Sequence, residues 1–430
     1  MAHRTWGWLL AVVAALGCAT AAAAEEIVWW NWDPPAAREA FQPAIDAFTA
    51  ATGIEVRIQT QDWGALKEKL ILAVAGGVAP DVTSVSSIWA EELADQGVFV
   101  DLNPLIKSDR SGFPYDDIFP ASYALWQTYD GKQYAMPFDN DIQALFYNKG
   151  LFDAAGVSYP GEDFDWETWL TTATALTRDV NGDQEMDQFG FVNWWFEWLT
   201  LIWANGGALV SPDRTVTLNT PAVREALRFY GQFFETQRDL ILTTADSKRM
   251  GYPHPAAAWK AGHAAMAPAG AWMPTYWIYD EAAGRYNFEF DVAHMPLSPA
   301  GKRATINEGQ GVAMLASTAH PEAAFRFLKH LAGEQMQTIA GRRGQFPVRR
   351  SIAASAAFLP PNTPPEHKAV FVEVAAYARP APHGVNWAEL RPALYREFGR
   401  YFSGDVGLEE AIVQAETAAR PILNEARAGR

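Results

Sequence analysis

The 430-residue chain has one cysteine, Cys18, and a shortage of basic residues. A single cysteine excludes a disulfide framework and every metal site built from several cysteines. The 34 Lys and Arg residues are outnumbered by 50 Asp and Glu residues, which gives a formal net charge of -16. Such a chain repels phosphate backbones and anionic lipids, so we expect no nucleic-acid partner and no peripheral membrane binding.

The motifs of several enzyme classes are also missing. The sequence has no P-loop, no G-x-G-x-x-G, no G-x-S-x-G elbow and no H-E-x-x-H. His254 and His263 lack the spacing of metal ligands. Asp139 and Asp141 would share one face of a strand, as a glycosidase pair would, but acidic chains produce such pairs often. We therefore expect no enzyme and no required cofactor, with a secreted polysaccharide-active enzyme as the alternative.

Apart from one short run near the N-terminus, long apolar segments are lacking. Arg4 precedes an apolar stretch over residues 6–17, and Ala22-Ala23-Ala24 fits the A-x-A cleavage pattern. The stretch is too short to cross a bilayer, which takes about 20 apolar residues. We predict a signal peptide over residues 1–24 and a soluble, periplasmic mature protein.

A lipid-anchored form is the alternative at this end of the chain. Cys18 follows Leu16-Gly17, where a lipidated cysteine would lie. The usual lipoprotein pattern has leucine three residues before the cysteine, and here that position is Ala15.

Strand and helix signals alternate along the mature chain. Residues 26–30 are typical of a buried strand, and Ile54, Val56 and Ile58 alternate with polar residues as strands do. Between them Phe41, Ile45 and Phe48 lie on one helical face before Gly53. Further helices are predicted with Leu66, Leu70 and Val74 on one face, after Pro221, after Pro321, and over 408–428, and a further strand over 80–85. This order favours an α/β fold with mainly parallel sheets covered by helices.

One acidic loop has the spacing of a calcium site. Oxygen-bearing side chains occupy every second position, at Asp179, Asn181, Asp183, Glu185 and Asp187. Gln184 and Gly190 stand where an EF-hand has glycine and a bidentate glutamate. The alternatives are a structural calcium ion and an Asx-rich turn built around Asn181-Gly182.

The 18 tryptophans are the most informative feature of the composition. Sugar rings have apolar faces and a rim of hydroxyls, so they bind flat aromatic side chains together with amides and carboxylates. Helical or apolar contexts favour a core position for Trp126, Trp166, Trp169, Trp203 and Trp259. Neighbouring Gly, Pro or Asn residues favour a cleft position for Trp32, Trp272 and Trp387.

Several segments, in this order, resemble the extracellular solute-binding proteins of carbohydrate-uptake ABC transporters, the group related to maltose-binding protein. They include Thr52-Gly-Ile-Glu-Val56, Lys67 to Asp81, Asp130 to Pro137, Leu145 to Lys149, Trp259 to Met266 with Gly270-Ala-Trp272, His320 to Ala324 and Gly344 to Arg349. The resemblance implies two hinged lobes with the ligand between them. It also implies a sugar ligand, a membrane permease with a cytoplasmic ATPase as partner, and no catalytic residue.

The resemblance divides the mature chain into alternating parts. It implies residues 25–138 and 295–343 in the first lobe, and residues 139–294 and 344–430 in the second. The crossings are expected near residues 138–142, 291–296 and 341–346. The mature chain from Glu25 has no cysteine and no heptad pattern, so it is expected to be a monomer.

The ligand-binding residues that we expect, from the resemblance and from the polar residues beside the aromatics, are Trp32, Asp33, Trp63, Ser86, Ser87, Asp139, Trp195, Trp272, Glu308 and Trp387. Their carboxylates suit neutral sugar hydroxyls and equally a cationic amino sugar. A glycerol-phosphate-type solute is a further alternative, because Arg342, Arg343, Arg349 and Arg350 lie near the third crossing. An adhesive or structural protein would bind no small solute.

Overall fold

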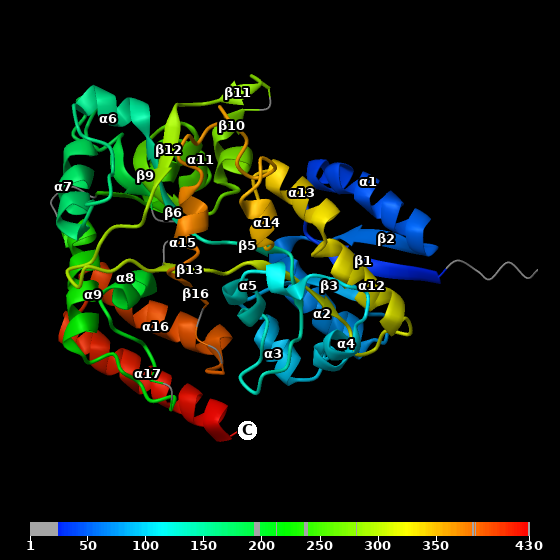
Figure 1. Cartoon of the computed structure of the whole chain (residues 1–430). Helices are drawn as coiled ribbons and strands as arrows, with labels where there is room; N and C mark the ends of the chain where they lie inside the picture. The colour runs from blue at the N-terminus through cyan, green and yellow to red at the C-terminus, as the bar shows by residue number, and fades with distance from the viewer. Residues whose placement is uncertain are drawn as a thin grey trace, which may run out of the picture.

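The computed structural model describes residues 25–192, 198–211, 213–235, 240–280, 282–380, 382 and 384–428. Two separate five-stranded sheets organise these residues. We call each sheet, with the helices that pack on it, a lobe. In Figure 1 the first lobe combines blue N-terminal elements with the yellow α12 and α13, and the second contains the green elements and the red C-terminal helices.

The first sheet has the order β2-β1-β3-β14-β4. Its strands are β1 (Glu25–Asn31), β2 (Ile54–Thr60), β3 (Val82–Ser86), β4 (Met136–Pro137) and β14 (Gln310–Met314). β1 runs parallel to β2 and β3, whereas β14 pairs antiparallel with both β3 and β4. The helices of this lobe are α1 (Pro35–Thr52), α2 (Leu66–Ala75), α3 (Ala90–Asp95), α4 (Asn103–Ser108), α5 (Pro120–Ala124), α12 (Pro321–Leu331) and α13 (Glu334–Arg342), with short turns η1 (Trp63–Ala65) and η2 (Tyr115–Asp117).

The second sheet has the order β12-β6-β9-β7-β8. Its strands are β6 (Ala144–Asn148), β7 (Phe189–Val192), β8 (Ile241–Leu242), β9 (Ala264–Ala269) and β12 (Phe290–Ala293). β6 is antiparallel to both β12 and β9, and β7 is parallel to β8 and β9. Its helices are α6 (Lys149–Ala155), α7 (Trp166–Leu176), α8 (Trp198–Ala204), α9 (Pro221–Glu235), α10 (Thr244–Arg249), α11 (Pro255–Lys260), η3 (Pro274–Ile278), α14 (Arg350–Ala353), α15 (Val370–Val374), α16 (Trp387–Phe402) and α17 (Leu408–Ala428).

The predicted α/β class with mainly parallel sheets is confirmed: in each sheet four strands run in one direction, and only β14 in the first sheet and β6 in the second run against them. Both sheets are mixed, because strands that the chain reaches after crossing between the lobes, such as β14 and β6, enter from the opposite direction. The predicted helices and strands near the N-terminus are present. Gly53, at a φ of 73°, ends α1 in the left-handed conformation that glycine adopts without strain.

The chain passes between the lobes in three places. It leaves the first sheet after β4 and enters the second at β6, returns between β12 and β14, and crosses again between α13 and β15 (Phe346–Pro347). Two short pairings lie along these passages: β5 (Asp139–Asn140) with β15, and β13 (Thr305–Ile306) with β16 (Ala378–Arg379). A small hairpin joins β10 (Tyr279–Asp280) and β11 (Arg285–Tyr286).

The second crossing, from the second lobe back to the first, lies near the C-terminal end of the segment between β12 and β14. Met295, Ala304 and Ile306 belong to the core beside the second sheet, although the predicted boundary gives residues 295–343 to the first lobe. The first strand of the first sheet after this segment, β14, begins at Gln310. The other predicted lobe boundaries remain predictions.

Each lobe has an aromatic-rich core. In the first lobe Trp29 contacts Phe327 edge to face, with ring centroids 5.5 Å apart. The five tryptophans predicted to be core residues are all buried, which confirms that prediction: Trp126, Trp166, Trp169, Trp203 and Trp259.

Candidate functional site

A cavity of about 900 Å³ is lined by residues of both lobes and of the crossing segments; we call it the central cavity. Its walls consist of Trp32, Asp33, Pro34, Trp63, Ser86, Ile88, Asp139, Asp141, Trp272, Trp277, Glu308, Gly309, Gln310, Gln345 and Arg391. The first lobe contributes the ends of β1 and β3, and the second lobe contributes the segment after β9 and helix α16. This placement fits the rule that ligands bind at the carboxyl ends of the strands of α/β sheets.

Asp33 is held at the end of β1, directly beside Trp32. Its side chain is buried, and the Asn31 amide donates a hydrogen bond of 3.1 Å to Asp33 Oδ2. Asn31 is fixed in turn by Thr60 on β2, whose hydroxyl donates to the Asn31 oxygen at 3.1 Å. A network across two parallel strands therefore sets the position of this carboxylate.

Asp139 lies on the first crossing segment and accepts hydrogen bonds from residues of two other segments. The backbone N–H of Gln310 donates to Oδ1 at 2.7 Å, and the Gln345 amide donates to Oδ2 at 3.2 Å. The Asp139 carboxylate therefore links its own crossing segment to β14 and to the third crossing segment. Because Asp139 also lines the cavity, these three segments are held together at the cavity wall.

Asp141 fixes the orientation of Trp272. The Trp272 indole N–H donates a hydrogen bond to Asp141 Oδ1, and the ring is only partly buried, with a face on the cavity. Gly270 makes this contact possible. A Cβ atom at residue 270 would lie 2.5 Å from Trp272 Nε1 and 2.8 Å from Asp141 Oδ1.

Replacing Gly270 with alanine should therefore displace the Trp272 ring. A displaced ring no longer stacks on the ligand, and loss of one stack removes roughly 1–3 kcal/mol of binding free energy, a weakening of about 5- to 150-fold. Gly399→Ala is the matched control, because Gly399 is exposed on α16 and a Cβ there meets no atom within 4 Å. Calorimetric titration of both variants tests this, and equal affinities would contradict it.

Glu308 joins the second crossing to both lobes. Arg391 Nη1 of α16 lies 3.7 Å from Glu308 Oε1, and the Ser87 hydroxyl donates to the Glu308 carbonyl oxygen. Glu308 is buried, so its carboxylate depends on groups such as Arg391 for compensation.

The cavity raises the pKa values of three of its carboxyl groups. Burial, followed by the charge of Asp139, raises the pKa of Asp33 to about 7, and Arg343 and Arg38 oppose this rise. Burial raises the pKa of Asp139 to about 6, against its two hydrogen bonds. Burial, then Asp139, raises the pKa of Asp141 well above the usual range. Each group therefore retains protons at a higher pH than an ordinary carboxyl group does.

Seven of the predicted binding residues line the central cavity: Trp32, Asp33, Trp63, Ser86, Asp139, Trp272 and Glu308. Trp63 is the most exposed of the tryptophans among them, with 53% of its surface accessible. Trp195 lies outside the described residues.

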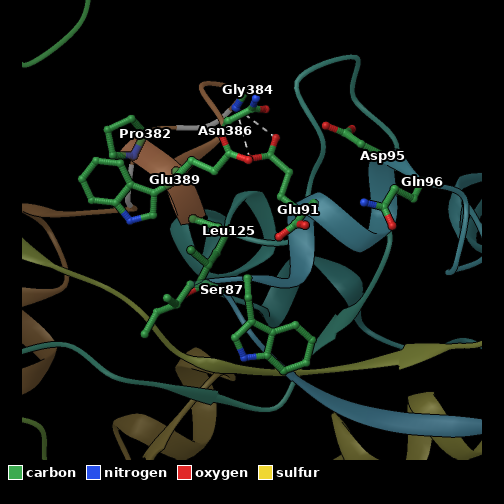
Figure 2. A pocket seen from close by; sticks show the side chains of 14 residues that line it. Ser87, Glu91, Asp95, Gln96, Leu125, Pro382, Gly384, Asn386 and Glu389 are labelled. Carbon is green, nitrogen blue, oxygen red and sulfur yellow. Dashed lines mark hydrogen bonds between the residues drawn. The ribbon is translucent and has the colours of Figure 1, made fainter. Parts of the chain in front are cut away.

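Ser87 and Trp387 instead line a neighbouring cavity of about 270 Å³, the side cavity (Figure 2). Trp387 is buried and packs into the core of the second lobe. Glu91 of α3 accepts the Gly384 N–H with both carboxylate oxygens at 3.1 Å, so a first-lobe helix contacts the second-lobe segment before α16. Ile88 lines both cavities.

Five polar or aromatic cavity residues are absent from the predicted set: Asp141, Trp277, Gln310, Gln345 and Arg391. Trp277 lies five residues after Trp272, so the clustering of aromatics in the sequence is a signal for it. The spacing of Asp139 and Asp141 indicates a carboxylate pair but not a role for Asp141 in binding. Gln345 lies within a segment that carries the family resemblance. Arg391, inside the amphipathic helix α16, has no local signal that distinguishes it from a surface arginine.

The acidic loop after α7 is folded around its own carboxylates. Asp179, Asp183 and Asp187 have carboxylate oxygens within 4.8 Å of one another. Asp179 accepts backbone hydrogen bonds from Gly182 at 2.6 Å and Gln184 at 2.8 Å. The Asn181 oxygen accepts the backbone N–H of Asp183 at 2.9 Å, and Glu185 lies 3.9 Å from Arg249 Nε. Three of the five predicted ligands are thus brought together as carboxylates.

Comparison with known proteins identifies the family. The sequence profile of the bacterial extracellular solute-binding proteins matches residues 32–338, which is more than half of the chain. The chain belongs to this family. None of its described helices is long and apolar enough to span a bilayer.

This family member is similar to a solved structure in fold and to two sugar-binding proteins in part of the sequence. An ABC substrate-binding protein of Listeria monocytogenes, solved in complex with cycloalternan, has a TM-score of 0.80 and 25% identity, over 93% of this chain and 99% of that one. The diacetylchitobiose binding protein of Streptomyces coelicolor is 26% identical over 215 residues, 49% of this chain and 48% of that protein. The lactose-binding protein of Rhizobium radiobacter is 29% identical over 164 residues, 36% of each chain.

Proposed function

We propose that this family member binds a sugar or oligosaccharide in the central cavity and delivers it to the membrane permease of an ABC importer. The observation that carries the proposal is the composition of the cavity wall, where Trp32, Trp272 and Trp277 alternate with carboxylates and amides. Aromatic faces pack against the C–H faces of sugar rings, and carboxylates accept hydrogen bonds from hydroxyls. The names of the relatives, which include binders of lactose and diacetylchitobiose, support the same ligand class.

The mechanism follows from the position of the cavity between two lobes. A ligand that touches both walls favours the arrangement in which the lobes lie close together. Asp33 and Ser86 represent the first lobe in this wall, and Trp272 and Arg391 the second. Micromolar affinity corresponds to a binding free energy of roughly −8 kcal/mol. A few stacked rings and charged hydrogen bonds supply this after the entropic cost of immobilising the ligand and the side chains is subtracted.

A thermal-shift panel of neutral, acetylated and amino sugars, as mono- and oligosaccharides, tests the proposal. A ligand that binds only the folded state raises the melting temperature as its concentration increases. We expect at least one sugar to produce such a concentration-dependent rise. A panel without any stabilising sugar would contradict the proposal.

We also propose that the protein binds its sugar without chemical change. The family consists of binding proteins, whereas a glycosidase would use a pair such as Asp139 and Asp141. In the described structure Asp141 accepts the Trp272 indole N–H, and Asp139 accepts hydrogen bonds from Gln310 and Gln345, as expected of residues that shape a binding site. Release of reducing ends from an oligosaccharide, abolished by Asp139→Asn, would support the enzyme instead.

Export to the periplasm fits membership of an extracellular family. We propose that residues 1–24 are removed after Ala24, with lipid attachment at Cys18 as the alternative. Mass spectrometry of the mature protein distinguishes a chain that begins at Glu25 from an acylated one that begins at Cys18.

The protein is proposed to act as a monomer whose lobes approach each other on binding. Small-angle scattering should show a monomeric mass and a smaller radius of gyration at ligand saturation, because closure shortens the molecule. A stable dimer, or a radius that does not change with ligand, would contradict this prediction.

The acidic loop is proposed to hold a structural calcium ion through Asp179, Asn181, Asp183, Glu185 and Asp187. The observation that favours it is the convergence of three carboxylates, which would repel one another without a cation. Chelator should lower the melting temperature of calcium-loaded protein, and Asp183→Ala should remove that response. Asp163→Ala, at an exposed aspartate outside the loop, should keep it. Identical melting curves with and without chelator would leave the loop as an Asx-rich turn.

A further inference from the structure

The walls of the two adjoining cavities are strongly and unequally charged. The central cavity is lined by Asp33, Asp139, Asp141 and Glu308, and the side cavity by Glu91, Glu92, Asp95 and Glu389. Arg391 is the one cationic side chain among the described residues that line either cavity. Among the described lining residues, acidic side chains therefore outnumber basic ones by eight to one.

Arg391 forms an ion pair with one of these acids. Its guanidinium lies 3.7 Å from Glu308. Asp33, Asp139 and Asp141, which we call the aspartate trio, line the same cavity, and the charge of Asp139 raises the pKa of both others. Arg343 and Arg38 act on Asp33 from behind the wall, without lining the cavity.

The hydrogen-bonding capacity of the trio points to a particular partner. Ionised carboxylates only accept hydrogen bonds, whereas an ammonium group has three donors and no acceptor. A neutral hydroxyl supplies only one donor to these oxygens. A cation placed among the trio would restore the charge balance that burial removes.

We infer that the ligand is an amino sugar, or an oligosaccharide with an unacetylated amine, whose ammonium group binds among Asp33, Asp139 and Asp141 while its ring packs on Trp272. The inference rests on the proposed sugar-binding function and names the ligand class. Two acids of the side cavity already have protein partners, because Glu92 pairs with Lys67 at 2.7 Å and Glu91 accepts the Gly384 N–H, so the inference concerns the trio alone.

Disaccharides that differ only at the 2-position provide the test. Chitobiose carries amines, N,N′-diacetylchitobiose carries acetamides and cellobiose carries hydroxyls on the same backbone. Glucosamine and galactosamine, each with its acetylated and neutral counterpart, extend the comparison to other sizes and configurations. In calorimetric titrations at pH 7 we expect an amine to bind about 10- to 150-fold tighter than its neutral counterpart, the contribution of a hydrogen bond to a charged group.

The pH dependence has a defined sign. A cation binds the ionised trio, so the amine must displace the protons that these groups hold below their raised pKa values, near 7 for Asp33 and near 6 for Asp139. Its affinity should rise between pH 5 and pH 7 and should fall on addition of salt. The charged groups that act on the trio are Arg38 and Arg343, which oppose the rise in the pKa of Asp33, and Glu308, which adds to the rise in the pKa of Asp141.

Asp139→Asn should reduce the preference for the amine to a few-fold, and Asp163→Asn, at an exposed site, should leave it intact. If Asp139→Asn does not fold, the preference and its pH dependence in the unaltered protein decide the question. A neutral or acetylated sugar that binds as tightly as its amine would overturn the inference and leave sugar binding in place. Absence of binding by every sugar, amines included, would overturn the proposed function as well.

Discussion

Replacing Trp272 with alanine is expected to weaken sugar binding by about 5- to 150-fold. The ring faces the central cavity, and Asp141 holds it there through the indole N–H. Loss of one stacked ring removes roughly 1–3 kcal/mol, by analogy with bases stacked on aromatic side chains. Because Trp272 is only partly buried, the melting temperature of the free protein should fall by no more than a few degrees. Calorimetric titration and thermal melting of the same preparation measure both effects.

Replacing Trp203 with alanine should have the opposite result. Trp203 lies on α8 inside the core of the second lobe, where 7% of its surface is accessible. Removal of a buried indole leaves a cavity that costs about 3–5 kcal/mol of unfolding free energy. Denaturant unfolding should therefore show a lower midpoint, whereas the folded variant should bind sugar with nearly unchanged affinity.

The two tryptophan variants control each other. If Trp203→Ala lost affinity while Trp272→Ala lost stability, the assignment of one ring to the site and the other to the core would be reversed. Two variants that lose both properties together would show that the site and the core are a single cooperative unit.

Local patterns predict the elements well because their causes are local. The face formed by Phe41, Ile45 and Phe48 identifies α1, and Gly53 ends it through a conformation that depends on one residue. The bounds of α17, Leu408–Ala428, agree with the helical spacing of its apolar residues. Polar and aromatic residues at strand ends similarly indicate Trp32 and Asp33 as cavity residues.

The rest of the cavity depends on contacts between distant segments. Asp141 and Trp272 are 131 positions apart, and Gln345 reaches Asp139 across 206. The local sequence pattern around each of these residues does not predict which distant residue it contacts. Trp387 shows the same limit, because its Asn neighbour suggests exposure, whereas the packing of α16 buries the ring.

The mixed strand directions have a related origin. Periodicity indicates where a strand lies but not which neighbour it pairs with, and β14 is inserted between β3 and β4 from a segment more than 170 residues beyond β4. The predicted parallel order therefore holds for β1, β2 and β3, whose connections are short.

The central place of β14 in the first sheet also has a kinetic consequence. Until the segment Gln310–Met314 is available, β3 and β4 have no strand between them, so the N-terminal part of the chain cannot complete its sheet. Sheets closed by contacts of such large sequence separation fold slowly. A chain that folds slowly stays unfolded for longer after synthesis. An unfolded chain is narrow enough to pass through a protein-conducting channel, whereas a folded lobe is not.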